Sequence, residues 1–330
     1  NIPYVNFRRN VITKGVRLND LVDKKFIIGD VMLDEYLWGA VNRVSPEAPV
    51  PVVKLDHIDY HAGGAANVAE NVYGLGCEVT MVGVIGDDEN GVKLENILSK
   101  DKRFNLHLIK QFDRPTTVKT RIMAQGQQMM RVDNETEENP SSKIYRDLQS
   151  TIHNILDRVD GLILQDYGKG LLSKEMISWI MRSAKDASLP VYVDPKDHNY
   201  ECYSGSRLLK PNLSEFWNYV DQGLSFEDTA ISFKTKNDYN ILLVTKGSEG
   251  MSIFYDNKIE HIPTKARSVH DVSGAGDTVI STFAVCDICG ADPLESATVS
   301  NYAAGQVCGM SGVVPIKIED LSNIYNDQDD

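Results

Sequence analysis

From Ser141 onward, short apolar runs alternate with segments of helical periodicity, and this alternation restricts the fold more than any other feature. The apolar runs are GLILQD, PVYVDP and NILLVT, and helices are expected over 142–159 and 173–187. Strands that alternate with helices of this length form a parallel sheet covered on both faces. We therefore expect an α/β protein with one mostly parallel central sheet, to which the earlier run FIIGD adds a strand.

Two stretches, 36–62 and 107–133, depart from this pattern because they are rich in Pro or Gly turns and have no helix beside them. Proline at the density of SPEAPVPVV excludes a central strand or a long helix, but it suits the edge strands of a small sheet. We expect the two stretches to form one β lid that projects from the core and covers a ligand. Apolar positions such as Val50 and Ile122 lead us to expect a homodimer through this lid.

The composition narrows the class of protein. With 330 residues, we expect a single domain over 1–330. The net charge of −13 disfavours nucleic-acid binding, although a few local cations would suffice for a small anionic ligand. The five cysteines do not form a disulfide framework, and neither a membrane span nor a signal peptide is recognisable. We expect a cytoplasmic protein with small-molecule ligands and neither nucleic acid nor membrane as a partner.

Polar residues follow the expected strands. In an open parallel sheet, ligands bind outside the carboxyl ends of the strands. Carboxylate and amide groups there suit contacts with a sugar or with a metal-bound phosphate. The strand-end residues are Asp30, Asp166, Asp194, Asn212 and Thr245-Lys246-Gly247.

The stretch HDVSGAGDTVIST (270–282) places an acid directly after a turn of small residues. The turn Gly274-Ala275-Gly276 lets backbone approach another group closely, and Asp277 lies where a helix is expected to start. Free amides at a helix start bind anions, which a carboxylate would normally repel. Asp277 is therefore either a simple helix cap or part of a reactive site.

The motifs resemble those of the ribokinase-like (pfkB-type) carbohydrate kinases over nearly the whole chain. The N-terminal signature is GGAANVA (63–69), followed by Gly76 and Gly86, and the C-terminal signature is DVSGAGDT (271–278). The resemblance implies a three-layer sandwich with a small projecting β lid. It also implies an ATP-dependent phosphotransferase with an alcohol acceptor, using ATP and Mg²⁺, and a monovalent-cation site for K⁺ as in several relatives.

Within that family, the chain most resembles the D-glycero-β-D-manno-heptose 7-phosphate kinases. The similar stretches are GDVMLDEYLWG, RVSPEAPVPVV, QDYGKG, VDPK and LLKPNLSEF, although AGG stands where those kinases often have PGG. The implied reaction phosphorylates the anomeric hydroxyl to give the 1,7-bisphosphate, a step in ADP-heptose and lipopolysaccharide-core biosynthesis. Many such kinases carry an adenylyltransferase domain with an H-x-G-H motif. This chain has no such motif, so we expect the kinase without a nucleotidyltransferase domain.

The resemblance assigns roles around the C-terminal signature. Asp277 would be the general base, and the backbone amides of Gly274, Ala275 and Gly276 would hold the transferring phosphoryl oxygens. Asp34 has a helix-turn cap as its alternative interpretation. The expected sugar-binding residues are Asp30, Asp34, Gly63, Gly64, Asn67 and Asp166.

The nucleotide side of the site is expected near the later strand ends. Glu215 would hold Mg²⁺ through water, because Mg²⁺ keeps several of its waters. Asp271 and Ser273 would border a monovalent-cation site, and Lys196 is either a phosphate contact or an ordinary surface lysine. The expected nucleotide-binding residues are Lys196, Asn212, Glu215, Thr245, Gly247 and Asn301.

Three basic residues could hold the phosphate of a phosphorylated sugar: Lys169, Arg121 and Arg131. Ion pairs with neighbouring acids are the alternative for each.

Other functions remain to be weighed. A kinase of the same family acting on a hexose, a pentose or a nucleoside would share every motif, and a non-catalytic sugar-sensing binder would share the scaffold. The intact Asp277 favours an enzyme over a binder. A dinucleotide-dependent dehydrogenase would need G-x-G-x-x-G, and a P-loop kinase would need G-x-x-x-x-G-K-[ST]; the chain contains neither motif.

Overall fold

The computed structural model describes residues 24–100, 104–196, 199–221, 223–264, 272–310 and 312–322. Its centre is a nine-stranded sheet in the order β13-β12-β11-β10-β9-β8-β1-β4-β5. Neighbouring strands are parallel except at β12, which is antiparallel to both β11 and β13. The strands are β1 (Lys24–Gly29), β4 (Glu78–Gly86), β5 (Phe104–Gln111), β8 (Gly161–Gln165), β9 (Val191–Asp194), β10 (Leu208–Leu209), β11 (Ile241–Thr245), β12 (Met251–Tyr255) and β13 (Lys258–Ile262).

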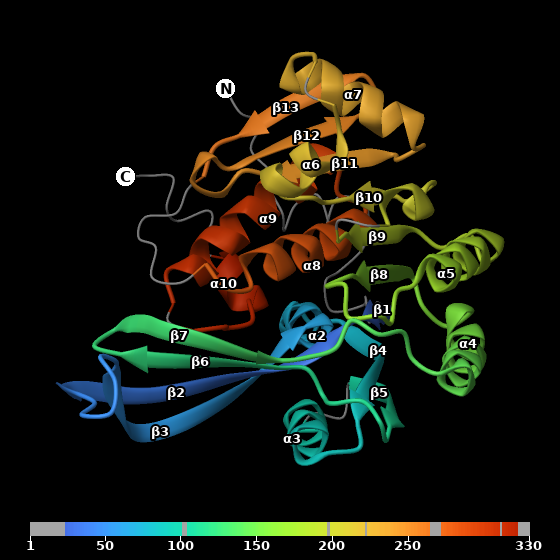
Figure 1. The fold of residues 1–330 in the computed structure, drawn as a ribbon. Coiled ribbons are helices and arrows are strands. Elements are labelled where there is room, and N and C mark those ends of the chain that lie inside the picture. Colours follow the sequence, from blue (N-terminus) through green and yellow to red (C-terminus); the bar gives the residue numbers. More distant parts are fainter. Residues whose placement is uncertain are drawn as a thin grey trace.

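Helices cover both faces of this sheet, so the body has three layers, as the sequence predicted (Figure 1). One layer contains α2 (Ala65–Gly74), α3 (Glu89–Leu98), α8 (Ala275–Ile288), α9 (Pro293–Cys308) and α10 (Ile318–Ser322). The opposite layer contains α4 (Ser142–Leu156), α5 (Lys174–Asp186), α6 (Leu213–Tyr219) and α7 (Phe226–Lys236). Within the described part of the chain, every helix is too short or too polar to cross a membrane.

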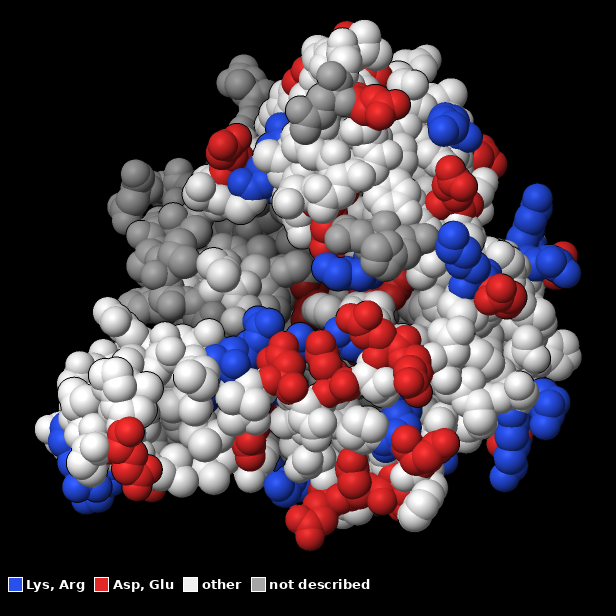
Figure 2. Space-filling view, viewed as in Figure 1, with Lys and Arg blue, Asp and Glu red and all other residues white. Residues whose placement is uncertain are grey.

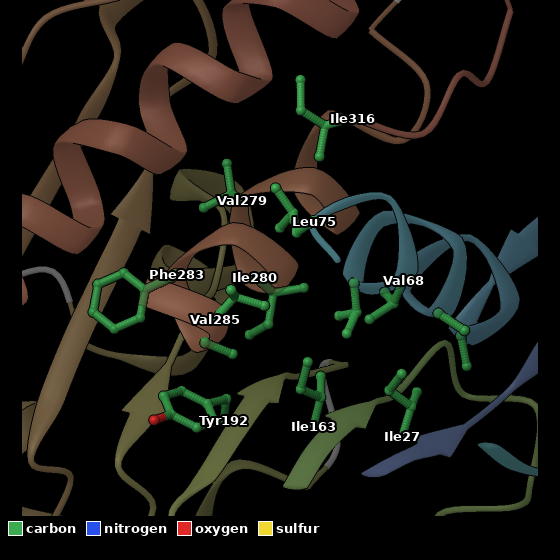
Figure 3. Close-up of a cluster of buried hydrophobic side chains, with 14 of the residues drawn as sticks. Ile27, Val68, Leu75, Ile163, Tyr192, Val279, Ile280, Phe283, Val285 and Ile316 are labelled. Carbon is green, nitrogen blue, oxygen red and sulfur yellow. The ribbon is translucent and has the colours of Figure 1, made fainter. Parts of the chain in front are cut away.

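Alternate residues of each central strand face opposite layers, which explains their almost uninterrupted apolar sequences. Figure 3 shows one of the two buried clusters, in which Ile280 and Phe283 of α8 pack over Ile163 and Tyr192 of the sheet. Helix α2 packs beside α8 in the same cluster. This burial fixes the N-terminal ends of both helices near the carboxyl ends of the strands.

A second sheet of four strands, in the order β3-β2-β6-β7, projects from the body as a lid (Figure 1). Strand β2 follows β1 after a single residue, Asp30, and β3 runs directly into α2. Val31 and Gly64 pair at the base of the lid, where it joins the body. The lid strands are β2 (Val31–Val44), β3 (Pro51–Gly64), β6 (Val118–Ala124) and β7 (Gln127–Asn134).

The expected lid boundary at 107 is wrong. Residues Phe104–Gln111 form β5, the edge strand of the large sheet, where they pair in parallel with β4. The sequence FNLHLIKQ mixes apolar and polar residues, as the lid strand β6 (VKTRIMA) does, and it is partly exposed along its length. The second lid segment therefore begins at Val118.

Candidate active site

A cavity of about 700 Å³ opens at the carboxyl ends of β8, β9 and β11 and at the N-terminus of α8. This is where an open parallel sheet binds its ligands. Residues from seven separate segments line it. Those expected from the sequence are Asp166, Asp194, Lys196, Asn212, Glu215, Thr245, Gly247, Gly274, Ala275, Gly276, Asp277 and Asn301.

The start of α8 is shaped by its small residues. Gly274 is the N-cap with φ of 80°, and a Cβ there would lie 2.8 Å from Nδ2 of Asn67. The first intrahelical bond runs from the amide of Thr278 to the Gly274 carbonyl at 2.9 Å, so the amides of Gly276 and Asp277 precede it. The amide of Ala275, expected to face phosphoryl oxygens, instead donates to the Val272 carbonyl at 3.3 Å.

Asp277 is 4% exposed and does not cap α8. Its Oδ2 accepts a hydrogen bond from Nδ2 of Asn67 at 2.8 Å. Its Oδ1 accepts from the hydroxyl of Tyr167 at 2.8 Å and from Nε2 of Gln165 at 3.2 Å. The simple-cap interpretation therefore does not describe this carboxyl group.

Burial raises the pKa of Asp277 to about 7, and the nearby Asp194 carboxylate acts in the same direction. The hydrogen bonds from Asn67 and Tyr167 and the Lys210 ammonium oppose this rise in pKa. A carboxyl group with a pKa near the working pH is suited to accept a proton during a reaction.

The sequence analysis missed Lys210, Tyr167 and Gln165. Lys210 is 3% exposed and its Nζ lies 3.0 Å from Oδ1 of Asp194, at the floor of the cavity. Nε2 of Gln165 bridges Asp194 (3.0 Å) and Asp277. Lys210 could have been considered because it ends the apolar run LLK before Asn212, a strand-end position like the others.

Asn212 and Glu215 form a capping box at the start of α6. Oδ1 of Asn212 accepts from the Glu215 amide, and Oε2 of Glu215 accepts from the Asn212 amide, both at 2.9 Å. Oε1 of Glu215 lies 3.7 Å from Nζ of Lys196. Burial and the proximity of Asp194 raise the Glu215 pKa. Among the residues that the structure describes, no three His, Cys, Asp or Glu side chains converge as a metal site. A divalent cation at Asp194 and Glu215 would need water and nucleotide phosphate as further ligands, which suits Mg²⁺.

Asp30 and Asp166 organise the loop after β8. Oδ2 of Asp30 accepts from the amides of Tyr167 (2.9 Å) and Lys169 (3.0 Å). Oδ1 of Asp166 accepts from the amide of Gly168 and Oδ2 from the hydroxyl of Tyr203, both at 2.8 Å. Burial, followed by the Asp166 charge, raises the Asp30 pKa to about 6.

Asp34 lies in strand β2 rather than in a helix turn, so its alternative as a helix cap is wrong. The carboxylate forms an ion pair with the Arg121 guanidinium, and both side chains are nearly buried. A Cβ on Gly63 would overlap Oδ2 of Asp34 and lie 2.8 Å from Cγ of Met32, so the missing side chain leaves room for the carboxylate beside this backbone. Gly64 has φ of 58°, a conformation that favours glycine, and follows directly.

The three expected phosphate-binding cations all have acidic neighbours. Nζ of Lys169 lies 2.8 Å from Oε1 of Glu135, and Nε of Arg131 lies 2.9 Å from Oδ1 of Asp133. Arg131 stands directly opposite Arg121 across β6 and β7. Figure 2 shows Lys and Arg side chains interleaved with Asp and Glu side chains at the hollow between lid and body. The structure thus contains the ion-pair alternative for all three, and none of them lines the cavity.

Asp271, one of the two residues expected at a monovalent-cation site, lies outside the described residues. Ser273, the other, is the second described residue after that gap. Asn301 donates from Nδ2 to the Pro263 carbonyl at 2.8 Å and so joins α9 to the segment after β13. Thr245 pairs with Asn212 through an isolated parallel bridge.

Comparison with known proteins places the chain in context. A family model described as pfkB family carbohydrate kinase matches residues 24–319. The Bifunctional protein HldE of Syntrophotalea carbinolica is 39% identical over 323 residues, covering 95% of this chain and 65% of that protein. The Bifunctional protein HldE of Actinobacillus succinogenes is 41% identical over 304 residues, covering 91% and 63%. The chain thus spans less than two thirds of the length of these relatives.

Solved structures share the fold at low sequence identity. Phosphofructokinase-2 from Escherichia coli, in complex with substrates and products, aligns with a TM-score of 0.79 at 16% identity, covering 93% of this chain and all of that one. Arabidopsis thaliana ribokinase, complexed with ribose and ATP, aligns with a TM-score of 0.71 at 19% identity, covering 92% and 99%.

Proposed function

Because the chain belongs to the pfkB family of carbohydrate kinases, we propose that it uses ATP to phosphorylate the anomeric hydroxyl of D-glycero-β-D-manno-heptose 7-phosphate. The product would be the 1,7-bisphosphate of ADP-heptose biosynthesis. The heptose-kinase stretches of the sequence, among them QDYGKG and LLKPNLSEF, support this acceptor. The observation that carries the chemistry is the buried Asp277 carboxyl, with a pKa of about 7, at the open start of α8.

Asp277 acts as the general base in this proposal. The acceptor hydroxyl donates its proton to an Asp277 carboxylate oxygen while its own oxygen forms a bond to the γ-phosphorus. The bond between that phosphorus and the β–γ bridging oxygen breaks, and ADP leaves with the electron pair. The amides of Gly276 and Asp277 and the Lys210 ammonium would stabilise the phosphoryl oxygens, since such transfer depends mainly on positioning and charge.

ATP in this family is used with a divalent cation, and we assign it as Mg²⁺. When bound, such a cation neutralises charge on the nucleotide phosphates. Asp194 and Glu215 would hold it, Glu215 through water, with Asn212 and Lys196 beside the phosphates. Thr245, Gly247 and Asn301 would border the rest of the nucleotide. Ser273, with Asp271 outside the described residues, would border a K⁺ site.

Lys169, Arg121 and Arg131 would bind the 7-phosphate of the sugar. Lys169 comes from the loop after β8, whereas the two arginines come from the lid, so the phosphate would draw lid and body together. On binding, the phosphate would replace acidic neighbours such as Glu135 as the partner of these cations. Charge-assisted contacts to phosphate are strong enough for this exchange.

The lid would also pair two copies of the chain in a cytoplasmic homodimer. The lid exposes apolar side chains that the body does not cover, including Val44 (64% exposed) in β2, Val50 (51%) in the turn before β3 and Met130 (59%) in β7. Exposed apolar groups gathered on one element are typical of an interaction surface.

Replacing Asp277 with Asn tests the base. The amide is nearly isosteric but cannot accept the proton, so we expect kcat to fall about 10²–10⁴-fold. ATP affinity, measured by calorimetry, should change little, and ADP release with and without sugar gives the rate. A variant that keeps most of its kcat would exclude Asp277 as the base. A wild-type protein that releases no ADP, with or without sugar, would favour the non-catalytic binder.

A panel of acceptors tests the substrate. Heptose 7-phosphate should exceed free heptose in kcat/KM by about ten- to a hundredfold, as expected for charge-assisted phosphate contacts. Arg131→Ala should narrow this difference by weakening only the phosphorylated acceptor. Arg158→Ala, a change of an exposed arginine at the far end of α4, is the matched control. Fructose 6-phosphate, ribose and adenosine complete the panel, and faster turnover of an unphosphorylated sugar would contradict the assignment.

A further inference from the structure

Two buried asparagines, one turn apart on α2, connect the carboxyl group of Asp277 to the segment after α9. Asn67 is 1% exposed and Asn71 is 0% exposed. Nδ2 of Asn67 donates to Oδ2 of Asp277 at 2.8 Å. Nδ2 of Asn71 donates to Oδ1 of Asn67 at 3.2 Å, and Oδ1 of Asn71 accepts from the backbone amide of Ile316 at 3.0 Å.

The polarity of this chain of hydrogen bonds follows from its last member. The two ends of an amide side chain have similar shapes, but one only donates and the other only accepts. A backbone N–H can only donate, so Asn71 must turn its oxygen toward Ile316. The hydroxyl of Thr278 also lies 3.1 Å from this oxygen, but it lies as close to the Gly274 carbonyl, so the Ile316 amide is what fixes the orientation. Nδ2 of Asn71 then faces Asn67, where the main-chain carbonyl (2.8 Å) and Oδ1 both accept from it.

The orientation of Asn67 decides which form of Asp277 it stabilises. Its NH₂ group favours the carboxylate, whereas its oxygen would accept a hydrogen bond from the protonated carboxyl group. An Asn67 side chain able to turn could therefore serve either form. Because Oδ1 of Asn67 is already held by Asn71, only the NH₂ group is available to Asp277.

We propose that Asn71 is a positioning residue of the phosphoryl-transfer site, fixing the Asn67 amide so that its NH₂ group always faces Asp277. This inference rests on the proposed role of Asp277 as the base. Its anchor is the packed segment around Ile316, whose side chain lies in the same buried cluster as α2 and α8 (Figure 3). The alternative is that Asn71 only stabilises the packing of α2.

Other groups facing Asp277 come from different elements. Asp194 ends β9, Lys210 follows β10, and Tyr167 belongs to the loop after β8. A substitution at Asn71 on α2 leaves these charged and titratable groups in the sequence unchanged. A shift in the titration of Asp277 would therefore report on the orientation of Asn67.

The test is the pH profile of kcat/KM for Asn71→Ala and Asn71→Ser, with the fastest acceptor of the panel. Both replacements are uncharged at every pH, so neither adds a titrating group, as Asn71→Asp would. We expect the ascending part of the profile to shift to higher pH by about 0.5–1 unit. The freed Asn67 amide can then turn its oxygen toward Asp277 and accept a hydrogen bond from the protonated carboxyl group, which raises the Asp277 pKa. The value of kcat/KM on the plateau at high pH should fall several-fold.

Asn237→Ala is the matched control. Asn237 is also buried, and its Nδ2 donates to the carbonyl of Phe233, four residues earlier, as Asn71 does to Asn67. This control should unfold at a lower temperature than the wild type, but the ascending part of its pH profile of kcat/KM should lie at the same pH. If the Asn71 variants fold and the ascending part of their pH profile lies at the same pH as in the wild type, the proposal is overturned and Asn71 has a packing role alone.

A measurement on the wild-type protein covers the case in which neither Asn71 variant folds. Gly274 lies beside Nδ2 of Asn67, so the side-chain amide protons of Asn67 should show nuclear Overhauser contacts to the Gly274 α-protons. These contacts should persist at pH 5.5 and at pH 8.5, on either side of about pH 7. Their loss at the lower pH would show that Asn67 turns, and would overturn the proposal.

The outcomes also separate this inference from the proposed function. If Asp277→Asn stays active, the base is wrong and the role of Asn71 falls with it. If Asp277→Asn is inactive while the ascending part of the pH profile of the folded Asn71 variants lies at the same pH as in the wild type, only the role of Asn71 fails.

Discussion

Three donors from distant parts of the chain converge on the Asp277 carboxylate: Asn67, Gln165 and Tyr167. The hydrogen bonds from Asn67 and Tyr167 oppose the effect of burial, which would otherwise favour the protonated acid. The balance places the Asp277 pKa near neutrality, where the carboxylate is present and still basic enough to accept a proton.

The rate of phosphoryl transfer should depend on pH through Asp277. The pKa of Asp277 is raised to about 7, so the ionised base predominates only above that pH. We expect kcat/KM to fall about tenfold for each unit below pH 7 and to level off above it. Initial rates of ADP release between pH 5.5 and 8.5 provide the measurement, and a flat profile would contradict it.

A single variant distinguishes Asp277 from Asp30, whose pKa is raised to about 6. Tyr167→Phe removes the hydroxyl that donates to Asp277 but keeps the backbone amide that donates to Asp30. The ascending part of the pH profile of kcat/KM should shift to higher pH if it reports the ionisation of Asp277. It should not shift if it reports the ionisation of Asp30.

Single residues were predictable where a local pattern carried them. The sequence marks Asp277 through its Gly-Ala-Gly turn and Asn212 through its strand end. Tyr167 and Gln165 are separated from Asp277 by 110 and 112 residues, and no local pattern records such a contact. For Lys169, the choice between phosphate contact and ion pair depends on Glu135, which only the folded lid brings near.

At the scale of elements, helix α2 is held by a close approach of backbone to backbone. A Cβ on Gly74, its last residue, would overlap the carbonyl oxygen of Ile316. The same segment donates the Ile316 amide to Asn71. Gly74 thus permits the contact through which the C-terminal segment holds α2.

Gly74→Ala should therefore destabilise the protein by about 1–3 kcal/mol, because the added methyl group forces the two backbones apart. Helix propensity alone predicts the opposite sign, a gain of up to about 1 kcal/mol. Urea unfolding gives the free energy. Gly223→Ala, where a Cβ would meet no atom within 4 Å, should leave stability within about 0.5 kcal/mol of wild type. A Gly74→Ala variant as stable as the wild type would contradict the close approach.

Elements were predictable where their period was unambiguous. The helix expected over 173–187 is α5, Lys174–Asp186, with Ser173 as its N-cap. Strand β5 was assigned to the lid because a partly exposed edge strand and the lid strand β6 have the same mixture of apolar and polar residues. Only its pairing with β4 separates the two, and pairing is a tertiary property.

For the whole molecule, the exposed lid predicts self-association. We expect sedimentation velocity to give a dimer for the wild type and a monomer for Val50→Asp, since a buried charge would cost more than the apolar contact returns. Leu224→Asp, at a residue 66% exposed outside the lid, is the control and should remain dimeric. A monomeric wild type, or equal dissociation of both variants, would exclude the lid as the interface.

The layered architecture as a whole was the most predictable property, because alternation of strand and helix is written along the chain from Ser141 onward. The relative position of lid and body was not, since it depends on β2 and β3 joining the body through Asp30 and Gly64.

The lid is thus attached to the body at the end where Asp30 and Gly64 lie, and its other end is free. Extra residues at the free end, between Val44 and Pro51, would lengthen a connecting turn and leave the pleat undisturbed. One extra residue at the attached end, between Asp30 and Val31, would turn every inward side chain of β2 outward. The tip can therefore gain residues without changing the register of β2 and β3, whereas the base of the lid cannot.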